Sequence, residues 1–148
     1  MTTPVYKTAL IDRVFFLRWE APPNLSDIHA VFEEMRDAHL RLKPPLVLVA
    51  SLSPRSAVPN SEQRNNLSAF QSEARPLFTQ IHAIVEGNDL QYNLQRVIIA
   101  GINIVTRSYD EAHQRVHKRA DQVAPLLSEC LGVDGDKVIE EARRRGVV

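Results

Sequence analysis

A continuous apolar run, Leu46-Val47-Leu48-Val49-Ala50, lies between a pair of prolines and a polar loop. The run is too short for a typical helix, and it lacks the alternating polar residues of a strand with one solvated face. It is therefore expected to form a strand that is buried on both faces. Such strands occur in sheets that helices cover on both sides. This segment predicts an α/β fold.

Two strand-like segments and one helix-like segment precede this run. Val5 to Ile11 and Val14 to Glu20 are rich in β-branched and aromatic residues, and the two-residue gap between them favours a tight hairpin. A helix capped by Asn24 or Ser26 is expected to run to about Leu42, because its apolar residues recur at helical spacing.

The segments after this run continue the alternation. A helix is expected from Ser61 to about Thr79, which Pro76 kinks or splits, and a strand Ile81–Val85, a helix Leu90–Ile99 and a strand Ile102–Thr106 follow it. The capping box of Ser108 and Glu111 then begins a helix that breaks or bends at Pro125, with Ala112, Val116, Ala120 and Val123 on one face. The last expected element is a helix Asp136–Arg145. Strands that alternate with helices pair in parallel, and the opening hairpin adds an antiparallel strand. We therefore predict a single domain, with one mixed sheet of about five strands covered by helices.

Composition argues against several functional classes. The 148 residues include 18 basic and 18 acidic residues, so no general attraction to nucleic acid or anionic membranes is expected. Cys130 is the only cysteine, which excludes a disulfide within the chain. No apolar stretch reaches the roughly 20 residues of a membrane-spanning helix, and the first residues lack a signal-peptide pattern. We expect a cytoplasmic protein with no membrane insertion.

The common catalytic and cofactor motifs are missing from this sequence. It has no glycine-rich phosphate loop, no nucleophile elbow and no zinc-binding helix motif. His113 and His117, with Asp121 as a third ligand, have the spacing of a metal site on a helix, but their polar neighbours favour a solvated helix face. The expectation is a non-catalytic protein with no metal and no cofactor.

Two reactive or charged features have simple structural interpretations. Arg143, Arg144 and Arg145 end the last expected helix, where they complement the helix dipole, so a solvated helix end is favoured over a nucleic-acid patch. Cys130 ends an amphipathic segment without a flanking basic residue, which favours a buried, inert thiol.

The strand Ile81–Val85 and the turn after it carry the candidate ligand-binding residues. These are His82, Glu86, Asn88 and Asp89. Ligands in α/β sheets often bind at the carboxyl ends of strands. His82 and Glu86 would point the same way from a regular strand and could act as an acid–base pair. The alternative, favoured because no nucleophile or cofactor motif accompanies them, is that His82 is a hydrogen-bonded sheet residue and that Glu86 and Asp89 are loop charges.

The order of elements resembles that of the STAS domain, and more narrowly that of the SpoIIAA-like, or STAS/SEC14-type, proteins of bacteria. The resemblance rests on the hairpin Val5–Glu20, the helix Ser26–Leu42, the strand Leu46–Ala50 leading to the helix at Ser61, the strands Ile81–Val85 and Ile102–Thr106, and the helix that begins Tyr109-Asp110-Glu111-Ala112. It covers residues 5–124 and leaves residues 125–148 as a C-terminal helical extension. It implies a regulatory domain that acts through protein partners.

The resemblance also implies a phosphorylation site. In this family a serine at the start of the helix after the third strand can be phosphorylated by a partner kinase, which switches protein binding. Ser61 holds the comparable position, where the helix dipole favours a phosphate. The sequence departs from the family pattern at Asn60, where aspartate is usual, and at Glu62-Gln63, where small residues and glycine are expected. Ser61 is the candidate phospho-switch.

Two hypotheses about function follow. The first is a non-catalytic bacterial regulatory or scaffold module that binds a protein partner, a role with which a homodimer is compatible. The second is a small-molecule or lipid-binding protein, or an enzyme without a recognisable motif, that uses the loop after Ile81–Val85. The missing catalytic motifs favour the first hypothesis. A pocket with convergent polar groups around His82 would favour the second.

Overall fold

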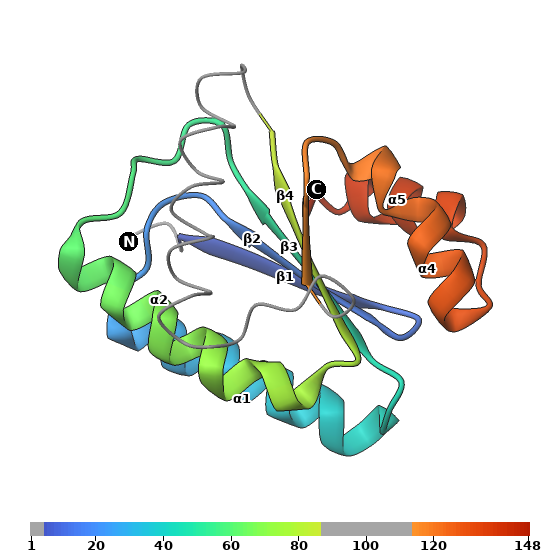
Figure 1. Cartoon of the computed structure of the whole chain (residues 1–148), viewed down its shortest axis with the longest axis horizontal. Helices are drawn as coiled ribbons and strands as arrows, with labels where there is room; N and C mark the ends of the chain where they lie inside the picture. Colours follow the sequence, from blue (N-terminus) through green and yellow to red (C-terminus); the bar gives the residue numbers. More distant parts are fainter. Residues whose placement is uncertain (1–4, 87–113) are drawn as a thin grey trace.

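The computed structural model describes residues 5–86 and 114–148 (Figure 1). In chain order, the elements are β1 (Tyr6–Ile11), β2 (Val14–Trp19), α1 (Leu25–Leu42), β3 (Val47–Leu52), α2 (Ser61–Ala74), the short helix η1 (Arg75–Leu77), β4 (Gln80–Val85), β5 (Gln114–His117), the short helix η2 (Ala120–Gln122), α4 (Ala124–Leu131) and α5 (Gly135–Arg144).

One mixed sheet forms the centre of the molecule. Its strand order is β1-β2-β3-β4-β5, in which β1 is antiparallel to β2 and every other neighbouring pair is parallel. The predicted hairpin joins β1 to β2 through Asp12-Arg13, with Asp12 at a φ of 52°. The predicted fold class, a single mixed sheet of about five strands covered by helices, is confirmed, and the described residues supply five strands.

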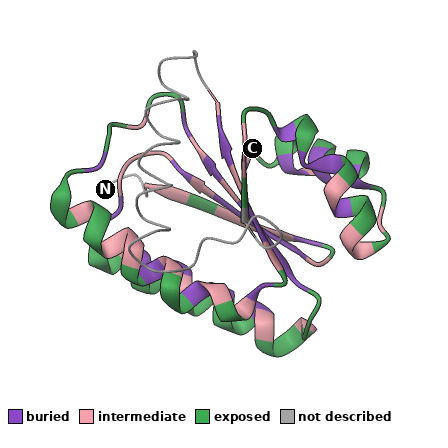
Figure 2. Ribbon diagram, viewed as in Figure 1, coloured by how far each residue is buried: buried purple, intermediate pink, exposed green. Residues whose placement is uncertain are grey.

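Helices cover both faces of this sheet (Figure 1). Side chains alternate along a strand, so Phe15 and Leu17 of β2 face α1 and α2, whereas Phe16 between them faces α4 and α5. Full burial of side chains of this size stabilises the fold by about 1.5–3 kcal/mol each. Figure 2 shows buried residues along the strands and on the helices. The apolar run Leu46–Ala50 is buried through Val49, as predicted for a central strand.

Capping boxes begin α1 and α2. The side chain of Asn24 accepts a hydrogen bond from the backbone N–H of Asp27, whose carboxylate accepts one from the N–H of Asn24. Asn60 and Gln63 repeat this arrangement at α2. Each box satisfies N–H groups that have no partner inside the helix. Pro76 splits the helix that was predicted from Ser61 to about Thr79. α2 ends at Ala74, and Pro76 lies in the short helix η1 that follows directly.

The prediction for residues 114–123 is wrong. The helical spacing of Val116, Ala120 and Val123 predicts one continuous helix, but residues 114–117 form β5 and the short helix η2 follows. β5 pairs in parallel with β4 and places Val116 opposite Ala83. The local sequence pattern carries no information about pairing with a distant strand, and here that pairing outweighs the helical spacing.

Pro125 also has a role other than the one predicted. The sequence predicts that it breaks or bends a helix, but it lies in the first turn of α4, where its missing N–H has no helical partner to lose. The predicted helix Leu90–Ile99, the strand Ile102–Thr106 and the capping box at Ser108 lie outside the described residues. Within residues 5–86 and 114–148, no helix is long and apolar enough to cross a membrane.

Candidate functional site

His82 lies in the middle of β4 and is only 2% exposed. It faces α4 and α5, as Ile84 does, because side chains two positions apart share one face of a strand. Its Nδ1 lies 3.0 Å from Nε2 of His117 on β5, and its Nε2 lies 3.0 Å from Oε1 of Gln80. Both ring nitrogens of this buried imidazole are therefore hydrogen-bonded to neighbouring side chains of the sheet.

These contacts set the direction of the hydrogen bonds. An amide oxygen only accepts, so Nε2 of His82 donates to Gln80, and in the neutral tautomer that makes this bond Nδ1 is an acceptor. Nε2 of His117 then donates to that Nδ1, and Nδ1 of His117 keeps its lone pair. Burial, and secondarily the charge of Arg115, lower the pKa of His117. Burial therefore favours the neutral form of His117.

The predicted cluster around His82 is assembled only in part. Glu86 follows β4 and is half-buried, while Asn88 and Asp89 lie outside the described residues. His82 contacts Gln80 and His117 through its ring nitrogens, which agrees with the hydrogen-bonded sheet residue of the sequence analysis. Sequence reasoning missed the partner His117, because it placed this residue on a helix.

His117 belongs neither to a metal site on a helix nor to the solvated helix face that the sequence favoured. His117 lies on β5, His113 lies outside the described residues, and the carboxylate of Asp121 pairs with Arg143 at 2.5 Å. In the part of the chain that the structure describes, no group of three His, Cys, Asp or Glu residues could hold a metal ion.

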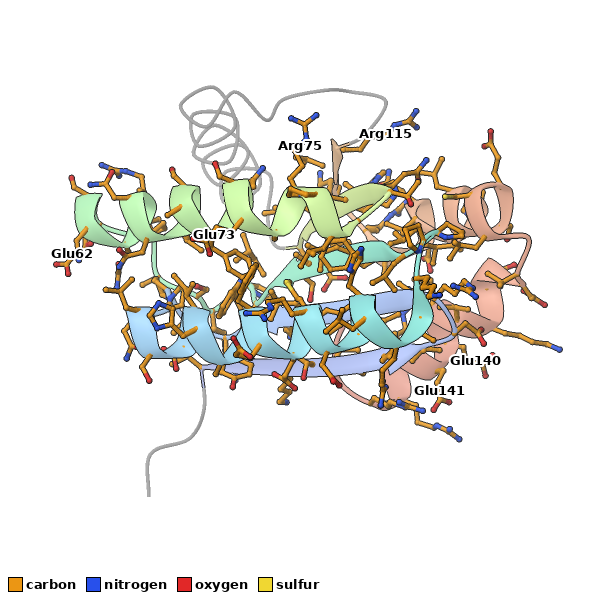
Figure 3. All side chains as sticks on the ribbon, turned by 90° about the horizontal axis from the view of Figure 1, so that it is seen from below. Glu62, Glu73, Arg75, Arg115, Glu140 and Glu141 are labelled. Atoms are coloured by element: carbon orange, nitrogen blue, oxygen red, sulfur yellow. The ribbon has the colours of Figure 1, made fainter. Side chains whose placement is uncertain are left out.

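Ser61 is the first residue of α2 and is exposed. Its Oγ accepts a hydrogen bond of 3.1 Å from Nη2 of Arg64, one turn later on the helix. The capping box uses the N–H of Gln63, whereas those of Ser61 and Glu62 have no partner among the described residues. Figure 3 shows Glu62 at the end of the molecule opposite α4 and α5. A phosphate at this position would meet one guanidinium and the positive end of a helix dipole.

The three arginines at the end of α5 are exposed, as predicted, and each has an acidic neighbour. Arg143 pairs with Asp121, while Arg144 and Arg145 both pair with Glu141, which Figure 3 shows on α5. The carboxylates lower the net positive charge at this helix end. These exposed pairs contribute little stability, because solvent screens them.

Cys130 departs from its prediction in one respect. Its side chain on α4 is half-buried and packs at the margin of the core, whereas full burial was expected. Burial, and secondarily the charge of Glu129, raise the pKa of this thiol. A raised pKa keeps the thiol protonated and weakly reactive, so the expected inert character has physical support.

Comparison of the chain with known proteins gave no match to a family model, to a curated protein or to a solved structure. The resemblance to STAS domains stays a prediction from the order of elements.

Proposed function

We propose that this protein is a non-catalytic regulatory module that binds a protein partner at the start of α2, and that phosphorylation of Ser61 switches this contact. The observation that carries the proposal is the setting of Ser61. Its hydroxyl is exposed on the first residue of the helix and lies 3.1 Å from the guanidinium of Arg64. The resemblance to STAS domains supplies the role of such a serine, and the geometry supplies the groups that would receive a phosphate.

The surface proposed for the partner is the α2 entry, defined as residues 53–64. Val58 is an exposed large apolar residue in this loop, at 45% of its full accessibility, and the exposed Arg55 lies three positions before it. Pro59, the next residue, is buried. An apolar residue within a polar rim has the composition of a protein contact site.

Arg64 links the switch residue to this surface. Its Nη2 donates to Oγ of Ser61 and its Nη1 donates to the carbonyl of Pro59 at 3.4 Å. A phosphate on Ser61 would add about 1.5–2 negative charges and new acceptors for the same guanidinium. The net charge of the α2 entry would then change from positive to negative. A partner whose charge complements the unmodified surface would bind the phosphorylated surface poorly, and the reverse would hold for a partner of opposite charge.

The use of polar groups elsewhere supports a non-catalytic role. His82 is engaged with Gln80 and His117, and the buried hydroxyl of Ser51 donates to a backbone carbonyl. These side chains satisfy buried polar atoms, which is the common structural use of such groups.

The proposal is tested by affinity capture from the native lysate with three forms of the full chain. These are the wild type, Ser61→Glu and Ser72→Glu, where Ser72 is an exposed serine on the same helix. We expect one stoichiometric protein partner, with equal capture by the wild type and Ser72→Glu and a change of about tenfold with Ser61→Glu.

Equal capture by the two glutamate variants would contradict the proposed switch. Native mass spectrometry of the chain isolated from its own cells provides the second readout. A protein that carries only a bound lipid or metabolite, with no protein partner, would favour the small-molecule hypothesis instead.

A further inference from the structure

β1 is an edge strand of the described sheet, with β2 on one side only (Figure 1). It spans six residues, from Tyr6 to Ile11, in unbroken register with β2. An edge strand of this kind presents a row of unpaired backbone N–H and C=O groups.

The register shows which residues of β1 carry these unpaired backbone groups. The N–H of Glu20 donates to the carbonyl of Val5, so these two residues form a hydrogen-bonded pair. Hydrogen-bonded and non-hydrogen-bonded pairs alternate along an antiparallel ladder. The backbone groups of Tyr6, Thr8 and Leu10 therefore point away from β2, and within the described residues they have no hydrogen-bond partner.

Within the described residues, β1 itself carries few of the devices that block pairing at a sheet edge. Sheet edges are commonly blocked by proline, by a bulge or by several charged side chains. β1 contains neither a proline nor a bulge, and Lys7 is its one charged residue. Tyr6 and Leu10 are partly buried apolar side chains on the face of α1, so each keeps apolar surface at the edge.

The chemistry of β1 suits a second copy of the same chain. An antiparallel pair of β1 strands, related by a twofold axis at Thr8, would place Tyr6 opposite the partner's Leu10 and Lys7 opposite the partner's Ala9. Aromatic and aliphatic side chains would then meet on one face, and the two lysines would not lie directly opposite each other. A twofold contact uses the same patch on both copies and closes after two chains.

We propose that the protein forms a homodimer in which two β1 strands pair antiparallel about Thr8 and join two sheets into one. In this dimer Tyr6, Thr8 and Leu10 each donate and accept one backbone hydrogen bond across the axis. The proposal does not depend on the switch at Ser61, because the α2 entry and β1 share no residues.

The test combines solution mass with amide hydrogen exchange on the full chain. Light scattering over a concentration series is expected to show twice the mass of one chain at high concentration. NMR-detected exchange is expected to show the amides of Tyr6, Thr8 and Leu10 protected only under dimer conditions. The amides of Lys7 and Ala9, which bond to β2, are expected to be protected at every concentration.

Two variants isolate the backbone contact. Thr8→Pro and Thr8→Val both remove the side-chain hydrogen bond from Thr8 to Glu34, but only the proline removes the outward N–H. We expect Thr8→Val to dimerise and Thr8→Pro to be a monomer with an unchanged far-UV spectrum. If Thr8→Pro does not fold, the exchange pattern of the wild type decides.

A monomer at every concentration up to about 1 mM would overturn the proposal, since a useful dimer needs tighter association. A dimer whose Tyr6, Thr8 and Leu10 amides exchange freely would also overturn it, because the contact would then lie elsewhere.

Discussion

Oγ of Ser51 donates a hydrogen bond of 2.9 Å to the backbone carbonyl of Val147, a residue 96 positions later in the chain. Both residues are 1% exposed, so this bond lies inside the molecule. Gly146, with a φ of 74°, turns the chain after α5 and brings Val147 over the sheet. The bond thereby connects the central strand β3 to the segment that follows the last helix.

Removal of this hydroxyl is expected to destabilise the fold. Ser51→Ala would leave the carbonyl of Val147 buried without its donor, at a cost of about 1–3 kcal/mol in the free energy of unfolding. Urea unfolding followed by circular dichroism measures this loss. The exposed Ser72→Ala is the control, and equal unfolding curves for the two variants would contradict a structural role for the bond.

The contact between α4 and α5 depends on a glycine. A Cβ added to Gly135 would lie 1.8 Å from the carbonyl oxygen of Ala124, so the two helices would have to move apart. We expect Gly135→Ala to lower the free energy of unfolding by about 1–3 kcal/mol, as overpacking typically does.

A second glycine in the same turn provides the control. Gly132 has a positive φ of 68°, and a Cβ there would meet nothing within 4 Å. Gly132→Ala carries only the conformational strain of a left-handed backbone, of about 1–2 kcal/mol. If Gly132→Ala proved the more damaging of the two variants in urea unfolding, the close approach of α4 and α5 would be refuted.

The histidine pair predicts a pH dependence of stability. The pKa of His117 in the folded chain lies below the ordinary value of 6.5, chiefly because of burial. Between these two values the unfolded chain binds more protons than the folded chain does. The free energy of unfolding therefore rises with pH across this window. The stabilisation is lost as the pH falls from about 6.5 toward the lowered pKa.

His117→Gln isolates this effect, because a glutamine amide can donate to Nδ1 of His82 but does not titrate. Urea unfolding at about pH 8 and about pH 5 is expected to show a smaller difference for this variant than for the wild type. His29→Gln, at an exposed position of α1, is the control. The same pH difference in all three proteins would show that His117 does not cause the pH dependence of stability.

The parts of the fold that depend on local sequence patterns could be predicted. The apolar run Leu46–Ala50 indicated a strand buried on both faces, and Pro76 indicated the split after α2. Neither signal depends on a distant residue. The strand β5 could not be predicted in this way, because its apolar residue Val116 also fits a helical spacing and its pairing with β4 spans about 30 residues of chain.

The candidate site was predictable to a similar extent. His82 and Ser61 stand out in the sequence by their positions next to expected elements. Arg64, three positions after Ser61 on an expected helix, carried a signal that helical spacing could have revealed. The partners His117 of His82 and Val147 of Ser51 carried no such signal, since sheet register and the turn at Gly146 bring them together.

Phosphopeptide mapping of the protein isolated from its own cells tests the proposed switch most directly. The chain is separated into the fraction bound to its protein partner and the free fraction, and the modification of Ser61 is quantified in each. We predict that Ser61 is phosphorylated in one fraction and unmodified in the other. An unmodified Ser61 in both fractions, or equal phosphorylation in both, would contradict it.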